Sequence, residues 1–128
     1  MIESVTIKDK TFNIPQASAV QQAELIQVAG GRIAFSSSKS DNAIDVNLIK
    51  GSLITIGTDN LMKIKSLVFD RIHLSGESEP VGIEFFQGQI DMFYTLLAEA
   101  IRVNLQDFFI SLDNAKKGIN PPSSSAVQ

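Results

Sequence analysis

Residues 93–112 read FYTLLAEAIRVNLQDFFISL and gather many large apolar side chains in one stretch. A helix surrounded by water does not carry so much apolar bulk, and the charges of Glu99, Arg102 and Asp107 are too frequent for a membrane-spanning helix. Apolar side chains recur at every third or fourth position, which predicts a helix with one apolar stripe. The stripe consists of Ile90, Phe93, Leu97, Ile101, Leu105, Phe108 and Leu112. A folded protein must cover such a stripe, either with the rest of the chain or with a second protein.

The length of this helix limits how it can be covered. A straight helix from Gln89 to Lys117 runs about 43 Å. A compact domain of this chain's length is only about 36 Å across. The helix therefore either breaks at Asn104, where Asp107 follows three residues later as at a helix N-terminus, or extends to a partner. We expect both a break at Asn104 and contact between part of the stripe and another protein.

The N-terminal part of the chain predicts a β-hairpin. Residues 4–14 alternate apolar and polar side chains on either side of the polar sequence Lys8-Asp9-Lys10. This period of two is typical of two short strands with one apolar face, and Pro15 predicts the end of the second strand. An isolated hairpin is only marginally stable in water, so we expect it to pack on helices.

Helical spacing follows the hairpin. Ser18 and Gln21 have the spacing of a capping box, and Gly30-Gly31 predicts the end of that first helix. Asp45 marks the start of a second helix, which Gly51 weakens.

A third helix is expected to begin at Thr58 or Asp59, with apolar residues from Leu61 to Ile72. Residues 74–82 predict a long turn or a second small strand pair. The expected fold class is α+β, a mainly α-helical single domain with a short N-terminal β-hairpin.

Composition narrows the possible functions. A net charge of −3 and a pI of about 5.0 argue against nucleic-acid binding and against attraction to an anionic membrane. The chain has no cysteine, so we expect no disulfide, zinc–thiolate site or thiol nucleophile. Its start lacks the pattern of a secretory signal, and the expected location is the cytoplasm. We expect one domain over residues 1–117 and a flexible polar tail over residues 118–128, which contain a double proline and a serine run.

Few side chains are arranged for chemistry. His73 is the only histidine and has no cysteine or helically spaced acid beside it. Residues 36–39 match the S-x-x-K pattern of serine acyl-enzymes, but they lie in a serine-rich loop without the companion motifs. Glu77 and Glu79 lie among turn residues, where solvation is the simpler interpretation. We therefore expect no enzyme activity, no catalytic residues, no cofactor and no metal site.

The aromatic residues of the C-terminal half leave two alternatives open. They belong to the core of the monomer, or one ring of each adjacent pair faces a protein partner, because neighbours on a helix point about 100° apart. Exposed aromatic side chains on a helix are common anchors of interfaces. We expect the chain to self-associate through this aromatic segment. The candidate interface residues are Phe85, Phe86, Phe93, Tyr94, Phe108 and Phe109.

Three segments together resemble the tail assembly chaperones of long-tailed, lambdoid-type bacteriophages. They are the hairpin VTIKDKTFNIP, the helix end GGRIAF and the segment EFFQGQIDMFYTLLAEAIRVNLQDFFISLDNA. The resemblance runs from the hairpin to about Ala115 and is densest over residues 84–115. It includes no catalytic signature.

The resemblance implies a function in the cytoplasm of an infected bacterial host. Proteins of this family are absent from the finished virion, bind the tape-measure protein, keep its apolar helices from aggregating and help to recruit tail-tube subunits. They are small, mostly helical and tend to self-associate. Many are made in two lengths, the longer by a −1 ribosomal frameshift. The sequence AKKG at 115–118 is where a slippery heptamer would lie, so that a longer product, which contacts the tail-tube protein, would leave this frame after Lys117.

Two other functions compete with this one. The chain could be a structural tail-completion or head–tail joining protein of a phage virion, which would be found in purified particles. An enzyme or a small-ligand protein would need a cluster of titratable groups in a pocket, and the sequence shows none.

Overall fold

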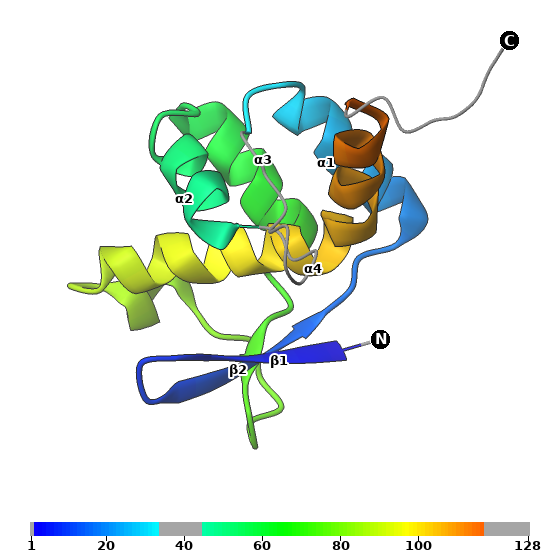
Figure 1. Ribbon diagram of the computed structural model, residues 1–128. Helices are drawn as coiled ribbons and strands as arrows, with labels where there is room; N and C mark the ends of the chain where they lie inside the picture. The colour runs from blue at the N-terminus through cyan, green and yellow to red at the C-terminus, as the bar shows by residue number, and fades with distance from the viewer. Residues whose placement is uncertain (1, 34–44, 117–128) are drawn as a thin grey trace, which may run out of the picture.

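The computed structural model describes residues 2–33 and 45–116 as a three-stranded sheet with helices on one side of it (Figure 1). This α+β, mainly helical architecture confirms the predicted fold class. The predicted tail over residues 118–128 and the S-x-x-K sequence at 36–39 lie outside the described residues. The elements are β1 (Ile2–Ile7), β2 (Lys10–Pro15), α1 (Ala19–Ala29), α2 (Val46–Ile54), α3 (Thr58–Val68), β3 (His73–Leu74), the 3₁₀ helix η1 (Ile83–Phe86) and α4 (Ile90–Lys116).

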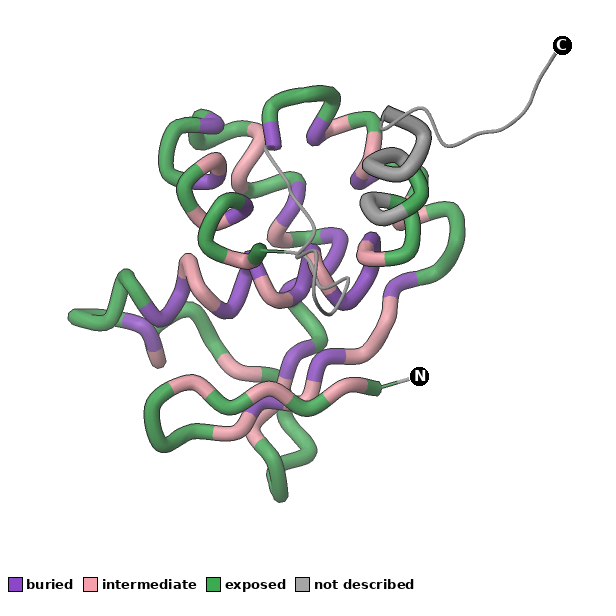
Figure 2. Tube along the Cα trace, viewed as in Figure 1, coloured by how far each residue is buried: buried purple, intermediate pink, exposed green. Residues whose placement is uncertain are grey.

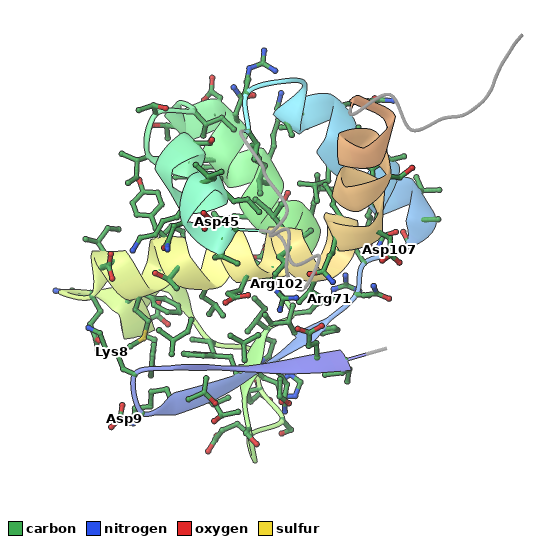
Figure 3. All side chains as sticks on the ribbon, in the orientation of Figure 1. Lys8, Asp9, Asp45, Arg71, Arg102 and Asp107 are labelled. Carbon is green, nitrogen blue, oxygen red and sulfur yellow. The ribbon has the colours of Figure 1, made fainter. Side chains whose placement is uncertain are left out.

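The predicted hairpin is present and gains a third strand. β1 and β2 are antiparallel, with Val5 opposite Phe12, and a two-residue turn at Lys8 and Asp9 joins them (Figure 3). β3 then pairs with the other side of β2, so that Leu74 lies opposite Phe12. Of the two alternatives for residues 74–82, the long turn is what is found. Only Leu74 of this range lies in a strand, and the Val81 amide donates to the Ile72 carbonyl over 2.8 Å across the turn.

The two faces of the sheet differ in polarity. Phe12 and Ile14 on β2 are fully buried against the helices. On the opposite face, hydrogen bonds between polar side chains run across the strands. Ser4 Oγ donates to Asn13 Oδ1 over 2.7 Å, and the hydroxyls of Thr6 and Thr11 are 2.9 Å apart. The sheet thus covers the core with one face and presents the other face to water.

The helix boundaries follow the local signals in the sequence. Ser18 and Gln21 form the predicted capping box, and α1 ends at Gly30 in a left-handed conformation with φ of 44°. The Asp45 side chain accepts a hydrogen bond from the Asn47 amide at the start of α2. These signals act within a few residues of one another, so they operate whatever the tertiary structure is.

α3 agrees with the sequence at its start but not at its end. It begins at Thr58, where Gly57 is the N-cap residue and supplies no side-chain hydrogen bond. It ends at Val68, so Ile72 lies beyond the helix rather than on it, although the side chain is fully buried. The apolar spacing thus indicated burial correctly but not helical structure.

α4 is the central layer of the molecule (Figure 1). α2 and α3 pack on it from one side, where α1 packs in turn on α3, and β1 and η1 contact it from the sheet side. An ion pair between Lys50 and Asp91 also links α2 to the first turn of α4. The hydrogen bond from Lys50 lowers the pKa of the exposed Asp91 carboxyl.

Most side chains of α4 between residues 92 and 105 are buried, as Figure 2 shows by the purple colour along this segment. A helix that is covered all round belongs to the core. Four stripe residues are therefore covered by their own chain, and the expectation that a partner covers the stripe is wrong for this part of it. The buried residues are Met92, Phe93, Leu96, Leu97, Ala98, Ala100, Ile101, Val103, Asn104 and Leu105.

The expected break at Asn104 is a bend. α4 is one continuous helix over 27 residues, which corrects the prediction of two helices. Its axis nevertheless turns sharply where yellow passes into orange in Figure 1. The turn allows a helix of about 40 Å to stay within a small domain.

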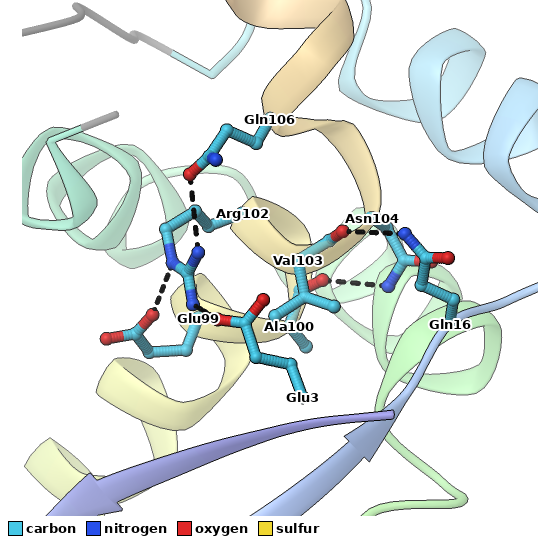
Figure 4. A network of polar contacts seen from close by, with 8 residues as sticks. All are labelled: Glu3, Gln16, Glu99, Ala100, Arg102, Val103, Asn104 and Gln106. Carbon is cyan, nitrogen blue, oxygen red and sulfur yellow. Dashed lines mark hydrogen bonds and ion pairs between the residues drawn. The ribbon is translucent and has the colours of Figure 1, made fainter. Parts of the chain in front are cut away.

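Side-chain donors at the bend explain why the helix turns (Figure 4). Asn104 Nδ2 donates to the carbonyl of Ala100, four residues earlier, over 2.8 Å, and Gln16 Nε2 donates to the carbonyl of Val103 over 3.1 Å. Such bonds compete with the backbone hydrogen bonds of a helix and bend it. Asn104 Oδ1 in turn accepts from the Ala17 amide over 2.8 Å and from Gln22 Nε2 over 3.1 Å.

Replacing Gly51 by alanine should stabilise the protein. Gly51 is exposed in the middle of α2, and a Cβ there would meet no atom within 4 Å. Gly51→Ala should therefore raise the free energy of unfolding by about 0.5–1 kcal/mol in a urea titration. Gly57→Ala is the matched control, because it also has open space but φ is 95°, and it should lower stability. Destabilisation by Gly51→Ala would mean that α2 is not a helix at this point.

Replacing Asn104 by alanine should destabilise the protein by about 2 kcal/mol, because the buried amide of Ala17 loses its acceptor. Urea unfolding measures this cost, and hydrogen exchange at Ala17 should become faster. Gln106→Ala is the control. Gln106 lies two residues after Asn104, is half-buried and accepts a hydrogen bond from Arg102, so its replacement should cost less than about 0.5 kcal/mol. Equal costs for the two variants would contradict the importance assigned to Asn104.

Candidate protein-binding surface

The reactive side chains of the described residues do not converge on a catalytic or metal site. Within residues 2–33 and 45–116, no group of three or more His, Asp or Glu side chains could hold a metal ion. His73 lies on the outer face of the sheet, with Nε2 3.4 Å from Asn13 Nδ2. Glu77 and Glu79 are both exposed, which agrees with solvation.

The most elaborate polar cluster surrounds Arg102 (Figure 4). Its guanidinium donates to Glu3 on β1, to Glu99 Oε1 over 2.7 Å and to Gln106 Oε1 over 3.3 Å. Burial by itself lowers the pKa of Arg102, but the hydrogen bonds to Glu3 and Glu99 outweigh this effect and raise the pKa overall. Each of the three guanidinium nitrogens thus donates one hydrogen bond, and the ion pair with Glu3 holds β1 against α4.

A small hollow lies beside this cluster. Its volume is about 150 Å³, whereas pockets for small molecules usually measure about 300–1,000 Å³. No buried side-chain nitrogen or oxygen in the described part of the chain lacks a hydrogen-bond partner. The hollow therefore offers no unsatisfied group that a ligand would complete. Its lining residues are Glu3, Gln16, Arg102, Val103, Asn104, Gln106 and Asp107.

Two of the candidate interface residues belong to the core. Phe86 and Phe93 are only 4% and 5% exposed. Their ring centroids are 5.7 Å apart, and both rings pack edge-on against Phe69, at 5.6 and 5.2 Å. Aromatic rings prefer such arrangements at these distances. In this conformation neither ring is available to a partner, so Phe86 and Phe93 do not belong to the surface in the monomer.

The other candidates lie at or outside the margin of this aromatic cluster. Phe85 is half-buried, with its ring centroid 6.1 Å from that of Phe12, and Tyr94 is half-buried beside Phe93. Phe108 is partly exposed on the part of α4 that follows the bend, and the side chain of Phe109 lies outside the described residues. The adjacent pair Phe85-Phe86 thus divides into one buried ring and one half-buried ring.

Two apolar side chains close to Phe85 in sequence are more exposed than the candidate residues whose side chains the structure describes. Ile83 is 52% exposed and Ile90 is 63% exposed. Both lie where the chain passes from η1 into α4 through Gly88, which has φ of 75°. We call Ile83, Phe85 and Ile90 the η1–α4 corner. The helical stripe included Ile90, but Ile83 follows a non-periodic segment and gave no signal in the sequence.

Comparison of the chain with models of known protein families, with curated proteins and with solved structures finds no match. Within the described residues, no helix has both the length and the hydropathy required to cross a membrane.

The effects of Phe86→Ala and Ile83→Ala on stability should show that Phe86 is a core residue and Ile83 a surface residue. Phe86→Ala should lower the free energy of unfolding by about 3–5 kcal/mol, because it leaves a cavity among packed rings. Ile83 lies three residues earlier in η1 and is exposed, so Ile83→Ala should change the free energy of unfolding by less than about 0.5 kcal/mol. Chemical denaturation of both variants measures the difference, and a large cost for Ile83→Ala would show that this side chain is not a surface residue.

Proposed function

We propose that this chain is a phage tail assembly chaperone, which binds the tape-measure protein and keeps it in solution during tail assembly. The resemblance of the hairpin and of residues 84–115 to that family supports the proposal. The structural observation that carries it is the η1–α4 corner. There, exposed Ile83 and Ile90 and half-buried Phe85 lie within eight consecutive residues, in the segment where the resemblance is densest.

The corner has the properties that a reversible apolar contact requires. Exposed apolar side chains on a monomer commonly mark interaction sites when they lie together. Within the corner, the ring of Phe85 packs edge-on against the buried ring of Phe86, so this side chain needs little further ordering when a partner binds. An amphipathic helix of the tape-measure protein would cover the corner with its own apolar side chains.

The charge of the chain suits this function. An acidic chain with a net charge of −3 repels other copies of its complexes, which helps a long apolar partner to stay dispersed. The proposal needs no catalytic group, cofactor or metal ion. It includes self-association, and recruitment of the tail-tube protein by a longer frameshift product. The last residue of the described chain is Lys116, so the position of the frameshift, after Lys117, lies just beyond it.

Co-expression tests the proposal directly. The chain should increase the soluble fraction of the tape-measure protein encoded next to it. Replacing both Ile83 and Ile90 by glutamate should abolish this effect and weaken binding about thirtyfold or more, as expected for the loss of an interface anchor. Val20→Glu is the control, because Val20 is an exposed apolar residue on α1, and α1 lies at the opposite end of the molecule from the start of α4 in Figure 1. Loss of activity in the control as well would remove the η1–α4 corner from the proposal.

Salt dependence and virion content provide independent tests. Binding through apolar side chains should change little when salt is raised to about 0.5 M, because salt screens mainly exposed charges. Dissociation at that salt concentration would show that charges dominate the contact. The chain should also be absent from purified particles. Its presence there would instead favour a tail-completion or head–tail joining protein.

A further inference from the structure

The sheet has two edges that differ in their protection. β3 forms one edge and is only two residues long. β1 forms the other edge, spans Ile2–Ile7 and pairs with β2 at every residue without a bulge. Natural proteins blunt exposed edges with short strands, bulges, proline or lysine, because an open edge pairs readily with another strand. β3 is protected because it is too short to pair with much of another strand. The sequence IESVTI of β1 contains neither proline nor lysine, so β1 lacks these two forms of protection.

The register of the hairpin shows which backbone groups of β1 face outward. The turn contains only residues 8–9, so Ile7 and Lys10 close it as a hydrogen-bonded pair. Hydrogen-bonded and non-hydrogen-bonded pairs alternate along an antiparallel ladder. The pair Ile2–Pro15 then falls in the non-hydrogen-bonded class, which is consistent with the missing N–H of Pro15.

It follows that Ile2, Ser4 and Thr6 direct their N–H and C=O groups away from β2. No backbone group in the described part of the chain bonds to them. The unpaired edge therefore presents three consecutive sets of donors and acceptors, which is the repeat that an added antiparallel strand requires.

The side chains of β1 do not oppose the approach of a second strand. Its one charged residue, Glu3, is paired with Arg102 of the same chain. An inward-pointing charge normally protects an edge, but here the charge is already neutralised. On the same face as Glu3, Val5 and Ile7 are only partly buried at the margin of the core. A neighbouring strand would cover them further.

We propose that β1 pairs with β1 of a second copy of this chain, antiparallel, about a twofold axis at Ser4. In this register Ser4 faces Ser4 of the other copy, and Ile2 faces Thr6. All three outward residues of each copy are then hydrogen-bonded. Glu3 faces Val5 rather than the other Glu3, so no two carboxylates are directly opposed.

A second copy fits this edge because the edge is self-complementary. Shifting the axis by one residue, to Val5, leaves the outward groups of Ile2 without a partner and is therefore less favourable. The polar face of the sheet stays in water in the dimer, since its cross-strand hydrogen bonds between Ser4 and Asn13 and between Thr6 and Thr11 are made within each copy. The result is a continuous six-stranded sheet.

Ser4→Pro tests the pairing without disturbing the hairpin. The Ser4 N–H does not bond β2 in this register, so proline removes a donor from the outer edge only, a position where strands tolerate proline. Sedimentation velocity should show a dimer for the wild type, and Ser4→Pro should weaken it at least about tenfold. Ser4→Ala is the matched control, because it loses the same side-chain hydrogen bond to Asn13 but keeps the N–H, and it should remain dimeric. Circular dichroism and urea unfolding confirm that both variants are folded.

Cross-linking tests the position of the axis. The chain contains no cysteine, so Ser4→Cys introduces a single thiol. A short bismaleimide should join two copies at this position, whereas it should not join copies that carry Thr11→Cys on β2, two strands further from their counterpart. Cross-linking at Thr11 but not at Ser4 would overturn the proposed register.

Three outcomes would overturn the proposal as a whole, and they can be distinguished from failure of the proposed chaperone function. The wild type could be monomeric at high concentration. Its dimer could survive Ser4→Pro unchanged. It could also dissociate when Ile83 and Ile90 are replaced by glutamate, which would place the interface at the η1–α4 corner. A monomeric wild type would also contradict the self-association included in the proposed function, whereas solubilisation of the tape-measure protein is measured separately, by co-expression.

Discussion

The buried amide of Asn104 joins parts of the chain that lie far apart in sequence. Its oxygen accepts from the amide of Ala17, just before α1, and its nitrogen donates to Ala100 within α4. Among the side chains that the structure describes, it is the one buried polar residue. A buried polar group is costly unless its hydrogen bonds are made, so the link between β2 and α1 and the bend of α4 require each other. The arrangement of the sheet and the helices on the two sides of α4 depends on that bend.

The bend also decides which apolar side chains remain at the surface. The first arm of α4 is enclosed between the sheet and the pair α2 and α3, and this uses most of the stripe that the sequence displays. Exposed apolar residues of α4 are consequently found outside that arm, at Ile90 before it and at Phe108 after it. The surplus of apolar residues in this segment is therefore explained mainly by a core position, and Ile90 and Phe108 at the two ends of the described stretch are what it leaves exposed.

The sequence predicted those features that depend on neighbouring residues. The capping box at Ser18, the left-handed Gly30 and the cap at Asp45 each act within one helical turn, and all three are found. The sequence also identified Asn104 as a point of change in α4, but it predicted a break there with Asn104 as the cap of a second helix. Only the tertiary structure brings Ala17 and Gln22 to this amide and turns a break into a bend. For the same reason the sequence could not separate buried Phe86 from half-buried Phe85, or single out Ile83 as exposed.

The two proposed surfaces, the edge of β1 and the η1–α4 corner, bind through different chemical groups. Pairing at the edge of β1 uses backbone N–H and C=O groups, which every residue except proline provides, so it constrains the identity of Ile2, Ser4 and Thr6 only weakly. Contact at the η1–α4 corner uses the side chains themselves, so a charge at Ile83 or Ile90 alters it directly. Pairing at the edge depends on one side chain, that of Glu3. If its partner Arg102 were removed, an unpaired carboxylate would lie beside the incoming strand. The ion pair that holds β1 on α4 is thus also the condition under which a second β1 can approach.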